Sequence, residues 1–345
     1  MRAVWFNKPW DLEVRDVPDP VIQSPTDAII RTAATCVCGS DLWSLRGENT
    51  REHGTPIGHE FVGEVVDVGS EVRDVAVGDF VVVPFDLSCG SCPHCLNGAL
   101  GSCTNGTLLG QPAIGGAQAE LCRVTYADHN LVVVPGGRPR DALLPDLLAL
   151  TDVMATGYFC AVSARVKQGD TAAVIGDGAV GLSAVLSAKM LGAERIVAFS
   201  RNPERQALAR EFGATHIIEG RGDDAVEELL DLTNGIGADA ALECVGLGPA
   251  METAFAVARP GSTVGYVGVP HGTAFPTERM FRKNINVAGG IAPSLTYTPL
   301  LLRAVLDGHI SPGKYFDLKL PFEDIVQGYT AMNERTAIKA WSQLV

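Results

Sequence analysis

Four cysteines lie within fifteen residues of one another, with the spacing C-x2-C-x2-C-x7-C, at Cys89, Cys92, Cys95 and Cys103. A gap of two residues lets neighbouring thiolates reach one tetrahedral ion through a tight turn, and four thiolates fill the coordination shell of zinc. A filled shell leaves no position for a substrate, so we predict a structural zinc site. An iron–sulfur cluster is the alternative, but the spacing does not follow the usual ferredoxin runs.

Three further segments hold residues that can bind metal. Cys38 lies in Cys36–Asp41, His59 and Glu60 lie in Gly58–Glu64, and Asp152 lies in Thr151–Gly157. Taken singly, a Cys, His or Asp in a β-rich region is more often a packing or capping residue than a ligand. These segments indicate a second metal site only in combination with the four-cysteine loop.

A glycine fingerprint follows in the second half of the chain. Gly176, Gly178 and Gly181 match G-x-G-x-x-G, between a predicted buried strand at 171–175 and a predicted helix at 179–191. In this context the glycines shape the turn and admit a pyrophosphate, which binds the helix N-terminus. We therefore predict a dinucleotide site whose fingerprint contributors are Gly176, Gly178, Ala179, Val180 and Gly181.

The end of the next predicted strand bears on which dinucleotide binds. An NAD site usually has a carboxylate about 20 residues after the fingerprint, where it binds the ribose 2′-hydroxyl. Here that place holds Ser200 and Arg201, with Arg205 one helical turn further on. A hydroxyl and a guanidinium suit a 2′-phosphate. We predict a preference for NADP(H) over NAD(H).

The chain changes character near residue 150. Residues 1–150 contain short β-rich runs separated by Gly and Pro, which indicate a sheet or small barrel. Residues 151–290 alternate strands with helices of about ten residues, which predicts a doubly wound parallel sheet of six strands. The tail, 291–345, is predicted to form helices at 299–306 and 322–333 and to return to the first domain.

Together these marks resemble the zinc-dependent medium-chain alcohol dehydrogenases, and their order agrees over essentially the whole chain. The resemblance implies a GroES-like catalytic domain beside a Rossmann domain, and two Zn²⁺ per chain, one catalytic and one structural. The bacterial NADP-dependent secondary-alcohol branch is the nearest in pattern. The marks are Cys38–Asp41, Gly58–Gly63, the Cys89–Cys103 loop, Gly115–Glu120 and the glycine fingerprint.

Residue by residue, the resemblance implies that Cys38, His59 and Asp152 bind the catalytic zinc, with Glu60 as an exchangeable ligand. Ser40 would accept the proton of the alcohol, and Asp41 would orient the His59 ring. Many relatives continue the proton relay through a His three residues after this Ser; here that position is Trp43. The relay beyond Ser40 therefore stays open.

Composition narrows the partners. The chain has 345 residues, a net charge of −13 and 46% hydrophobic residues. Such an acidic protein is a poor ligand for nucleic acid or anionic membranes. No uninterrupted apolar run reaches about 18 residues, and the N-terminus does not look like a signal peptide. We expect a cytoplasmic protein with reduced thiols, and the resemblance implies a homo-oligomer, either dimer or tetramer.

The leading hypothesis is an enzyme that interconverts a small-molecule alcohol and its aldehyde or ketone with NADP(H). A polyol, sugar or formaldehyde-type dehydrogenase with the same zinc chemistry is a second hypothesis, because no motif identifies the substrate pocket. The third is a zinc- and nucleotide-binding protein without turnover, against which the set of Cys38, His59, Asp152 and Ser40 argues.

Overall fold

The computed structural model describes residues 1–345, which divide into two compact units. The first unit consists of Met1–Asp152 and Pro293–Val345, and the second is Val153–Ala292. The chain thus leaves the first unit after 152 and returns to it at 293, where the sequence predicts boundaries at 150 and 290. The tail is part of the first unit.

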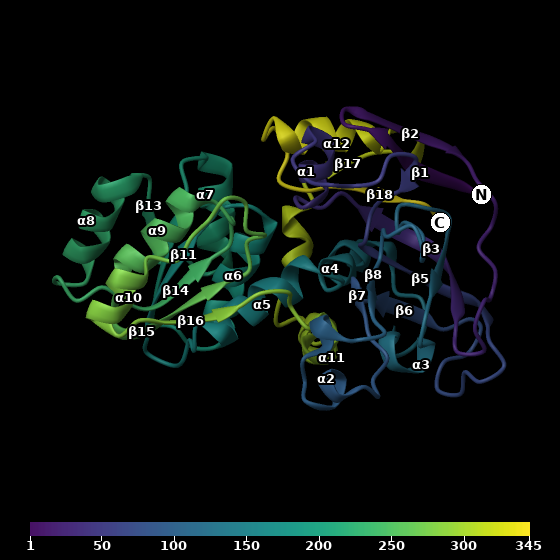
Figure 1. Cartoon of the computed structure of the whole chain (residues 1–345), viewed down its shortest axis with the longest axis horizontal. Coiled ribbons are helices and arrows are strands. Elements are labelled where there is room, and N and C mark those ends of the chain that lie inside the picture. Colours follow the sequence, from purple (N-terminus) through teal and green to yellow (C-terminus); the bar gives the residue numbers. More distant parts are fainter. The chain divides into compact units, whose positions relative to one another are not determined.

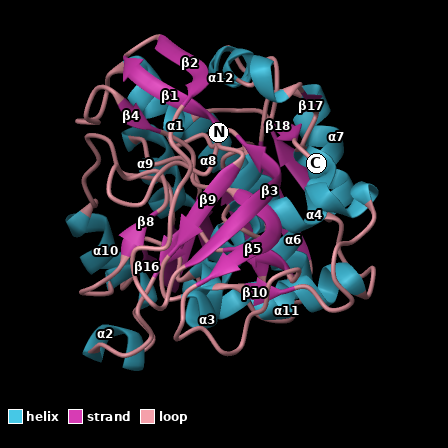
Figure 2. Ribbon diagram, turned by 90° about the vertical axis from the view of Figure 1, so that its right-hand side faces the viewer, coloured by secondary structure: helices cyan, strands magenta, loops and turns pink.

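An antiparallel sheet forms the core of the first unit, with the strand order β10-β6-β5-β3-β18-β17 and with β9 also paired to β3. Figure 2 shows β9, β3 and β5 as neighbouring strands. Hydrophobic residues such as Ile30, Phe61 and Val65 are fully buried beneath it. The strands are β3 (Ala28–Cys36), β5 (Phe61–Val68), β6 (Phe80–Val83), β9 (Leu121–Val124), β10 (Val132–Val133), β17 (Leu318–Lys319) and β18 (Ala340–Gln343).

Smaller elements complete the first unit, and most of its candidate site residues lie in the loops between elements. A three-stranded sheet has the order β2-β1-β4, and β7 pairs with β8. The strands are β1 (Arg2–Lys8), β2 (Asp11–Asp16), β4 (Thr55–Pro56), β7 (Asp86–Leu87) and β8 (Thr107–Leu108). The helices are α1 (Asp41–Arg46), α2 (Pro93–Leu96), α3 (Ala127–Asn130) and α4 (Leu144–Ala149), with 3₁₀ turns η1 (Leu100–Ser102) and η2 (Asp141–Leu143).

The helices of the tail differ from the predicted ones. The first helix, α11 (Ser294–Leu306), begins five residues before the predicted 299 and holds Pro299 inside it. Proline favours the first helical turn, so its position suggested a start there; instead Thr298, buried, bonds back to the Ser294 carbonyl. The second helix is split into η4 (Phe322–Asp324) and α12 (Val326–Asn333), and a further turn, η3 (Pro312–Tyr315), precedes it.

The second unit is the predicted six-stranded parallel sheet, with the order β13-β12-β11-β14-β15-β16 (Figure 1). Its central strands are runs of buried Ala, Val, Ile and Leu, as expected where helices cover both faces. The strands are β11 (Thr171–Ile175), β12 (Arg195–Phe199), β13 (His216–Ile218), β14 (Ala238–Glu243), β15 (Ala258–Tyr266) and β16 (Asn286–Gly289). The helices are α5 (Val153–Ser163), α6 (Ala179–Met190), α7 (Pro203–Phe212), α8 (Gly222–Leu232), α9 (Gly248–Val257) and α10 (Thr277–Lys283). The architecture is therefore a GroES-like unit plus a Rossmann-like unit, as predicted.

One helical stretch, Asp141–Ser163, is long and apolar enough to cross a membrane by length and composition. The sequence prediction considered only uninterrupted apolar runs and did not find it. Within its most apolar window, 78% of the stretch is buried inside the protein. Such burial is typical of a core helix, so the stretch is weak evidence for a membrane span.

Candidate active site and metal centres

The four-cysteine loop brings its thiols to the spacing of one metal ion. Cys92 lies 3.5 Å from Cys95 and 3.8 Å from Cys103, and Cys103 lies 3.5 Å from Cys89, measured between sulfur atoms. A tetrahedral zinc with bonds of about 2.3 Å separates its sulfur ligands by about 3.8 Å. The four residues present therefore fit a closed zinc site.

The thiol chemistry agrees with a cation at this place. Backbone amides of Cys95 and Thr104 lower the pKa of Cys92 to about 5. Burial and the neighbouring thiols raise the pKa of Cys95 to about 12. Adjacent thiolates repel one another, and a divalent cation relieves that repulsion. The loop packs with Leu100 against Leu295 at the start of α11, so the tail anchors it.

A second cluster joins the three segments that the sequence left apart. Cys38 follows β3, and His59 precedes β5; the antiparallel register Thr35↔Phe61 places the ends of these strands side by side. Asp152 Oδ2 lies 3.3 Å from His59 Nε2 and 3.6 Å from Cys38 Sγ. Tetrahedral zinc bonds of about 2.0–2.3 Å give nitrogen–oxygen and sulfur–oxygen separations of about 3.3 and 3.6 Å. The cluster fits zinc with three protein ligands.

Asp41 holds the His59 ring from the other side. Its Oδ1 lies 3.3 Å from His59 Nδ1, and its Oδ2 accepts a hydrogen bond from the Cys38 backbone amide at 3.1 Å. Burial opposes the charge of Asp41, but His59 lowers the pKa of its carboxyl. Burial likewise opposes a charge on His59, yet Asp41 and Cys38 raise its pKa well above the usual value. One carboxylate thus orients both a ligand ring and a ligand backbone.

Ser40 lies beside the ligand nitrogen of His59. The Ser40 Oγ is 3.5 Å from His59 Nε2, at the start of α1. Trp43 lies in the first turn of α1, and the Arg46 guanidinium lies 5.2 Å from the centre of its ring. The hydroxyl is therefore next to the predicted metal.

Glu60 belongs to the same cluster but has a partner that the sequence did not indicate. Ligand atoms of Cys38, His59, Glu60 and Asp152 all lie within 4.8 Å of one another. Lys339 Nζ donates to Glu60 Oε1 at 2.6 Å and to the Val37 carbonyl at 3.1 Å. Glu60 Oε2 is buried and has no hydrogen-bond partner. One oxygen of Glu60 is thus paired with Lys339, and the other remains able to bind metal.

Two further residues near the cluster were missed. The Phe85 ring packs edge-on against His59, with ring centres 6.0 Å apart. Asp86, 3% exposed, has no well-formed hydrogen bond to either carboxyl oxygen. Burial raises the pKa of Asp86 to about 7. Neither residue belongs to a motif with metal-ligand spacing, so only their position in the fold identifies them.

In the second unit, the fingerprint glycines have the predicted conformations. Gly176 has φ +122°, and a Cβ on Gly181 would lie 2.0 Å from the Gly176 carbonyl oxygen. A Cβ on Gly178 would meet nothing within 4 Å, and Gly178 offers no side-chain oxygen to the first-turn amides of α6. Open space before uncapped amides fits a pyrophosphate. Ala179 and Val180 form the first turn of that helix.

The ribose end of the site contains a carboxylate that the sequence analysis did not anticipate. Ser200 donates its hydroxyl hydrogen to Asp177 Oδ2 at 2.8 Å. Arg205 Nη1 lies 3.6 Å from Asp177 Oδ1, whereas Arg201 is exposed. Asp177 is the variable residue inside G-x-G, and only the pairing of β11 with β12 brings it to Ser200.

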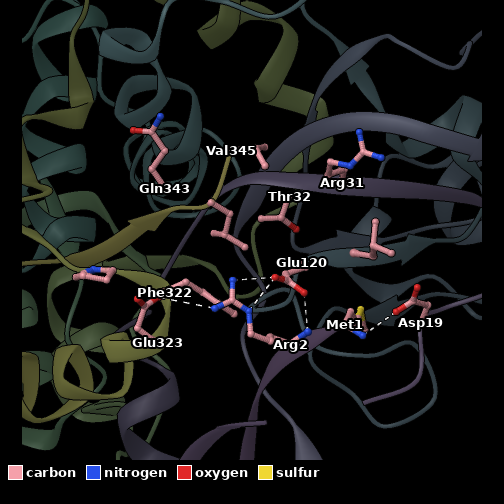
Figure 3. A pocket seen from close by; sticks show the side chains of 13 residues that line it. Met1, Arg2, Asp19, Arg31, Thr32, Glu120, Phe322, Glu323, Gln343 and Val345 are labelled. Carbon is pink, nitrogen blue, oxygen red and sulfur yellow. Dashed lines mark hydrogen bonds and ion pairs between the residues drawn. The ribbon is translucent and has the colours of Figure 1, made fainter. Parts of the chain in front are cut away.

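A separate surface pocket of about 580 Å³ contains none of the predicted site residues. It lies between β1 and the C-terminal segment, and includes Arg2, Arg31 and Glu120 (Figure 3). Within it Arg2 pairs with Glu120 at 2.9 Å and the N-terminal amine pairs with Asp19 at 2.7 Å. Its charged groups are largely paired with each other, so we assign it no role.

Comparison with known proteins agrees with this geometry. The family described as "Alcohol dehydrogenase GroES-like domain" matches residues 24–136, and "Zinc-binding dehydrogenase" matches residues 179–306. Zinc-type alcohol dehydrogenase B of Aspergillus flavus is 34% identical over 342 residues, covering 96% of this chain and 79% of that protein. A glutathione-independent formaldehyde dehydrogenase of Pseudomonas aeruginosa is 35% identical over 260 residues, covering 71% of this chain and 65% of that protein.

Solved structures extend the likeness to the whole fold. The alcohol dehydrogenase TADH from Thermus sp. ATN1 has a TM-score of 0.92 and 33% identity, with full coverage of both chains. A zinc-dependent alcohol dehydrogenase from Streptococcus pneumoniae has a TM-score of 0.90 and 31% identity, covering 100% of this chain and 99% of that one. On these matches and on its fold, the chain belongs to the zinc-dependent alcohol dehydrogenases of the medium-chain dehydrogenase family.

Proposed function

We propose that this protein interconverts an alcohol and its aldehyde or ketone, with a nicotinamide dinucleotide as hydride carrier. The observation that carries the proposal is the three-ligand cluster of Cys38, His59 and Asp152 with a hydroxyl beside it. Three ligands leave zinc an open position, whereas the four-cysteine loop leaves none. We therefore propose one catalytic and one structural zinc per chain.

Zinc, when bound, supplies Lewis-acid polarisation of the substrate oxygen, and the nicotinamide supplies or accepts the hydride. The chain's own residues orient the metal ligands and move a proton. In this proposal the Ser40 hydroxyl accepts the alcohol proton during oxidation while it passes its own hydrogen to the next group of the relay, which stays open, and the transfer reverses during reduction. Asp41 keeps the His59 ring in one orientation, so that Nε2 stays with the ligand set.

The identity of the dinucleotide stays a prediction. The exposed Arg201, beyond the end of β12, supports the predicted preference for NADP(H), because guanidinium binds phosphate well. The carboxylate of Asp177 acts in the opposite direction, because it repels a phosphate and accepts hydrogen bonds from a ribose hydroxyl. Both groups belong to the second unit, so the relative affinities for NAD(H) and NADP(H) can be compared by binding measurements without catalysis.

A formaldehyde-type or polyol dehydrogenase is the second candidate. The similarity to glutathione-independent formaldehyde dehydrogenase supports it, as does a likeness to a 2R,3R-butanediol dehydrogenase from Bacillus subtilis. Both would use the same cluster and the same Ser40. The two candidates differ only in the substrate accepted.

A substrate panel of primary, secondary and polyhydric alcohols, with formaldehyde and larger carbonyl compounds, tests the proposal. The zinc-replete protein is assayed with NAD(H) and NADP(H) by the absorbance of the reduced nicotinamide. Turnover on simple alcohols or carbonyls supports the main proposal, and turnover confined to polyols or formaldehyde supports the second. No turnover by protein that holds zinc in both sites would favour a non-catalytic nucleotide-binding protein.

A further inference from the structure

The motif Gly115–Glu120 contributes no ligand to the candidate active site, yet it holds a fully buried glutamine, Gln118. We infer that Gln118 is a positioning residue, whose side-chain amide sets the separation between the metal ligands Cys38 and His59. The tail residue Tyr329 in turn holds that amide in place. The inference rests on the proposed binding of zinc by these ligands. All the residues involved belong to the first unit.

The two metal ligands lie where the pairing of their strands has ended. Strands β3 and β5 are paired as far as Thr35 and Phe61, and Cys38 and His59 lie beyond that pair. Zinc accepts ligand atoms only at the separations set by its tetrahedral geometry. A contact that ties the two segments together beyond the strand pair therefore helps to hold the ligand atoms at those separations.

Gln118 supplies such a contact, because it binds both segments at once. Its Nε2 donates to the Cys36 carbonyl at 2.9 Å, two residues before Cys38. Its backbone amide donates to the Ile57 carbonyl at 3.4 Å, two residues before His59. The backbone bond forms with any side chain at this position, whereas the bond to Cys36 needs the side-chain amide. One residue thus connects the segments that lead to both ligands.

The close approach of Gly58 shows how tightly Gln118 packs against the segment of His59. Gly58 has φ +92°, and a Cβ at this position would lie 2.5 Å from Cγ of Gln118. The Gly58 carbonyl also accepts from the Ala117 amide at 2.9 Å. The residue next to His59 therefore lies directly on the Gln118 side chain, so a displacement of Gln118 also displaces the backbone that leads to His59.

Tyr329 of α12 fixes the orientation of the Gln118 amide. A carbonyl oxygen can only accept, so the Gln118 nitrogen faces Cys36, and Oε1 faces the Tyr329 hydroxyl. That hydroxyl donates to Gln118 Oε1 at 2.9 Å. Both side chains are 0% exposed, so solvent does not compete for these hydrogen bonds. A residue of the tail thus acts on the ligand set through Gln118.

Zinc release to a chelator tests the inference without any catalytic step. Zinc-loaded protein is equilibrated with increasing concentrations of chelator, and the zinc that stays bound is measured. Asp152→Ala lacks one ligand of the catalytic cluster, so its release curve reports the four-cysteine loop. The difference between the wild-type curve and this curve reports the catalytic cluster. Each further variant is measured with and without Asp152→Ala in the same way.

Gln118→Met keeps the unbranched chain and the contact with Gly58 but removes the amide. It should weaken zinc binding at the catalytic cluster by about 10–100-fold, the range for loss of a residue that orients metal ligands. Zinc binding at the four-cysteine loop should stay as in the wild-type protein. Gln327→Met, at an exposed glutamine of α12, is the matched control and should change neither site.

Tyr329→Phe removes only the hydroxyl and leaves Gln118 in place. It should weaken zinc binding at the catalytic cluster by about threefold to tenfold, as expected for one hydrogen bond. Because Tyr329 acts through Gln118, the double variant should bind zinc no more weakly than Gln118→Met alone. This non-additivity distinguishes positioning through Gln118 from two independent losses of stability.

Three results would overturn the inference while leaving the proposed function intact. The first is an unchanged zinc affinity of the catalytic cluster in folded Gln118→Met, or in Tyr329→Phe if Gln118→Met does not fold. The second is equal weakening at both zinc sites, which would show a general loosening of the unit. The third is full additivity in the double variant. If the wild-type protein and Asp152→Ala release the same zinc, the proposed catalytic zinc itself is wrong, and the inference is overturned with it.

Discussion

Lys339 and Glu60 form an ion pair of 2.6 Å in the interior of the first unit, although 279 residues separate them in the chain. Both side chains are 1% exposed. The pair exists because β18 returns to pair with β3, Trp341 opposite Cys36, which brings Lys339 behind the candidate catalytic cluster. The tail thus supplies the charge that balances the carboxylate next to His59.

Removing one partner of this pair should destabilise the protein strongly. Lys339→Met leaves Glu60 buried and uncompensated, which should lower the free energy of unfolding by about 3–5 kcal/mol. Glu60→Gln combined with Lys339→Met removes both charges and should recover most of the loss. Urea denaturation measures both. Lys8→Met, an exposed lysine at the end of β1, is the control and should change little; equal stability of Lys339→Met and Lys8→Met would show that the pair is not as buried as the structure has it.

The two metal sites should lose their ions independently. Metal analysis of the wild-type protein should give about two zinc ions per chain. Cys92→Ser should remove one of them and lower thermal stability, since a closed cysteine site holds its loop folded. Asp152→Ala should also remove one, with a smaller loss of stability and a complete loss of turnover. A single zinc in the wild-type protein, or iron in the cysteine loop, would contradict the assignment.

Ser40 should matter for turnover and not for metal binding. Ser40→Ala removes the hydroxyl that lies 3.5 Å from His59 Nε2 and should lower kcat by about 10²–10⁴-fold, the range for loss of a positioned proton carrier. Zinc content and dinucleotide affinity should stay as in the wild-type protein. Ser70→Ala, at an exposed serine, serves as the matched control. If Ser40→Ala keeps full kcat, the proton leaves by another route.

Asp86 should make stability depend on pH in a defined direction. Burial raises its pKa from the usual 3.8 to about 7, so the folded protein holds a proton there that the unfolded chain releases. The free energy of unfolding should therefore decrease as pH rises from about 4 to about 7, and the penalty is complete above that. Three pKa units correspond to a penalty on the order of 4 kcal/mol.

Asp86→Asn carries no titratable proton and should abolish this part of the pH dependence. Denaturation of both proteins at several pH values measures the difference between them. The variant should be more stable than the wild-type protein at pH 8 and similar to it near pH 4. A difference that does not vary with pH would show that Asp86 is ionised in the folded protein throughout.

The features that sequence reasoning recovered are those set by local patterns. The fingerprint glycines, such as Gly176 and Gly181, follow from steric needs of a turn between a strand and a helix. The four thiols at Cys89–Cys103 lie in one loop, and the structure brings them together as their spacing predicts. The six parallel strands follow from alternating buried runs and helices, and that prediction is confirmed.

The features that it missed depend on pairing between distant segments. Asp177 meets Ser200 only through the β11–β12 register, and Lys339 meets Glu60 only through β18. The predicted preference for NADP(H) was drawn from Ser200 and Arg201 without Asp177, and it stays a prediction. The early start of α11 was missed because Pro299 was taken for a first-turn proline.

Transfer of hydrogen from carbon to the nicotinamide tests the central claim most directly. Zinc-replete protein is incubated with oxidised dinucleotide and an alcohol that carries deuterium on the carbinol carbon, and the reduced dinucleotide is analysed by mass spectrometry. The account predicts one deuterium in the reduced nicotinamide with the wild-type protein, and none formed by Asp152→Ala. Reduced dinucleotide without deuterium, or no reduction across the panel by protein with both zinc sites filled, would contradict it.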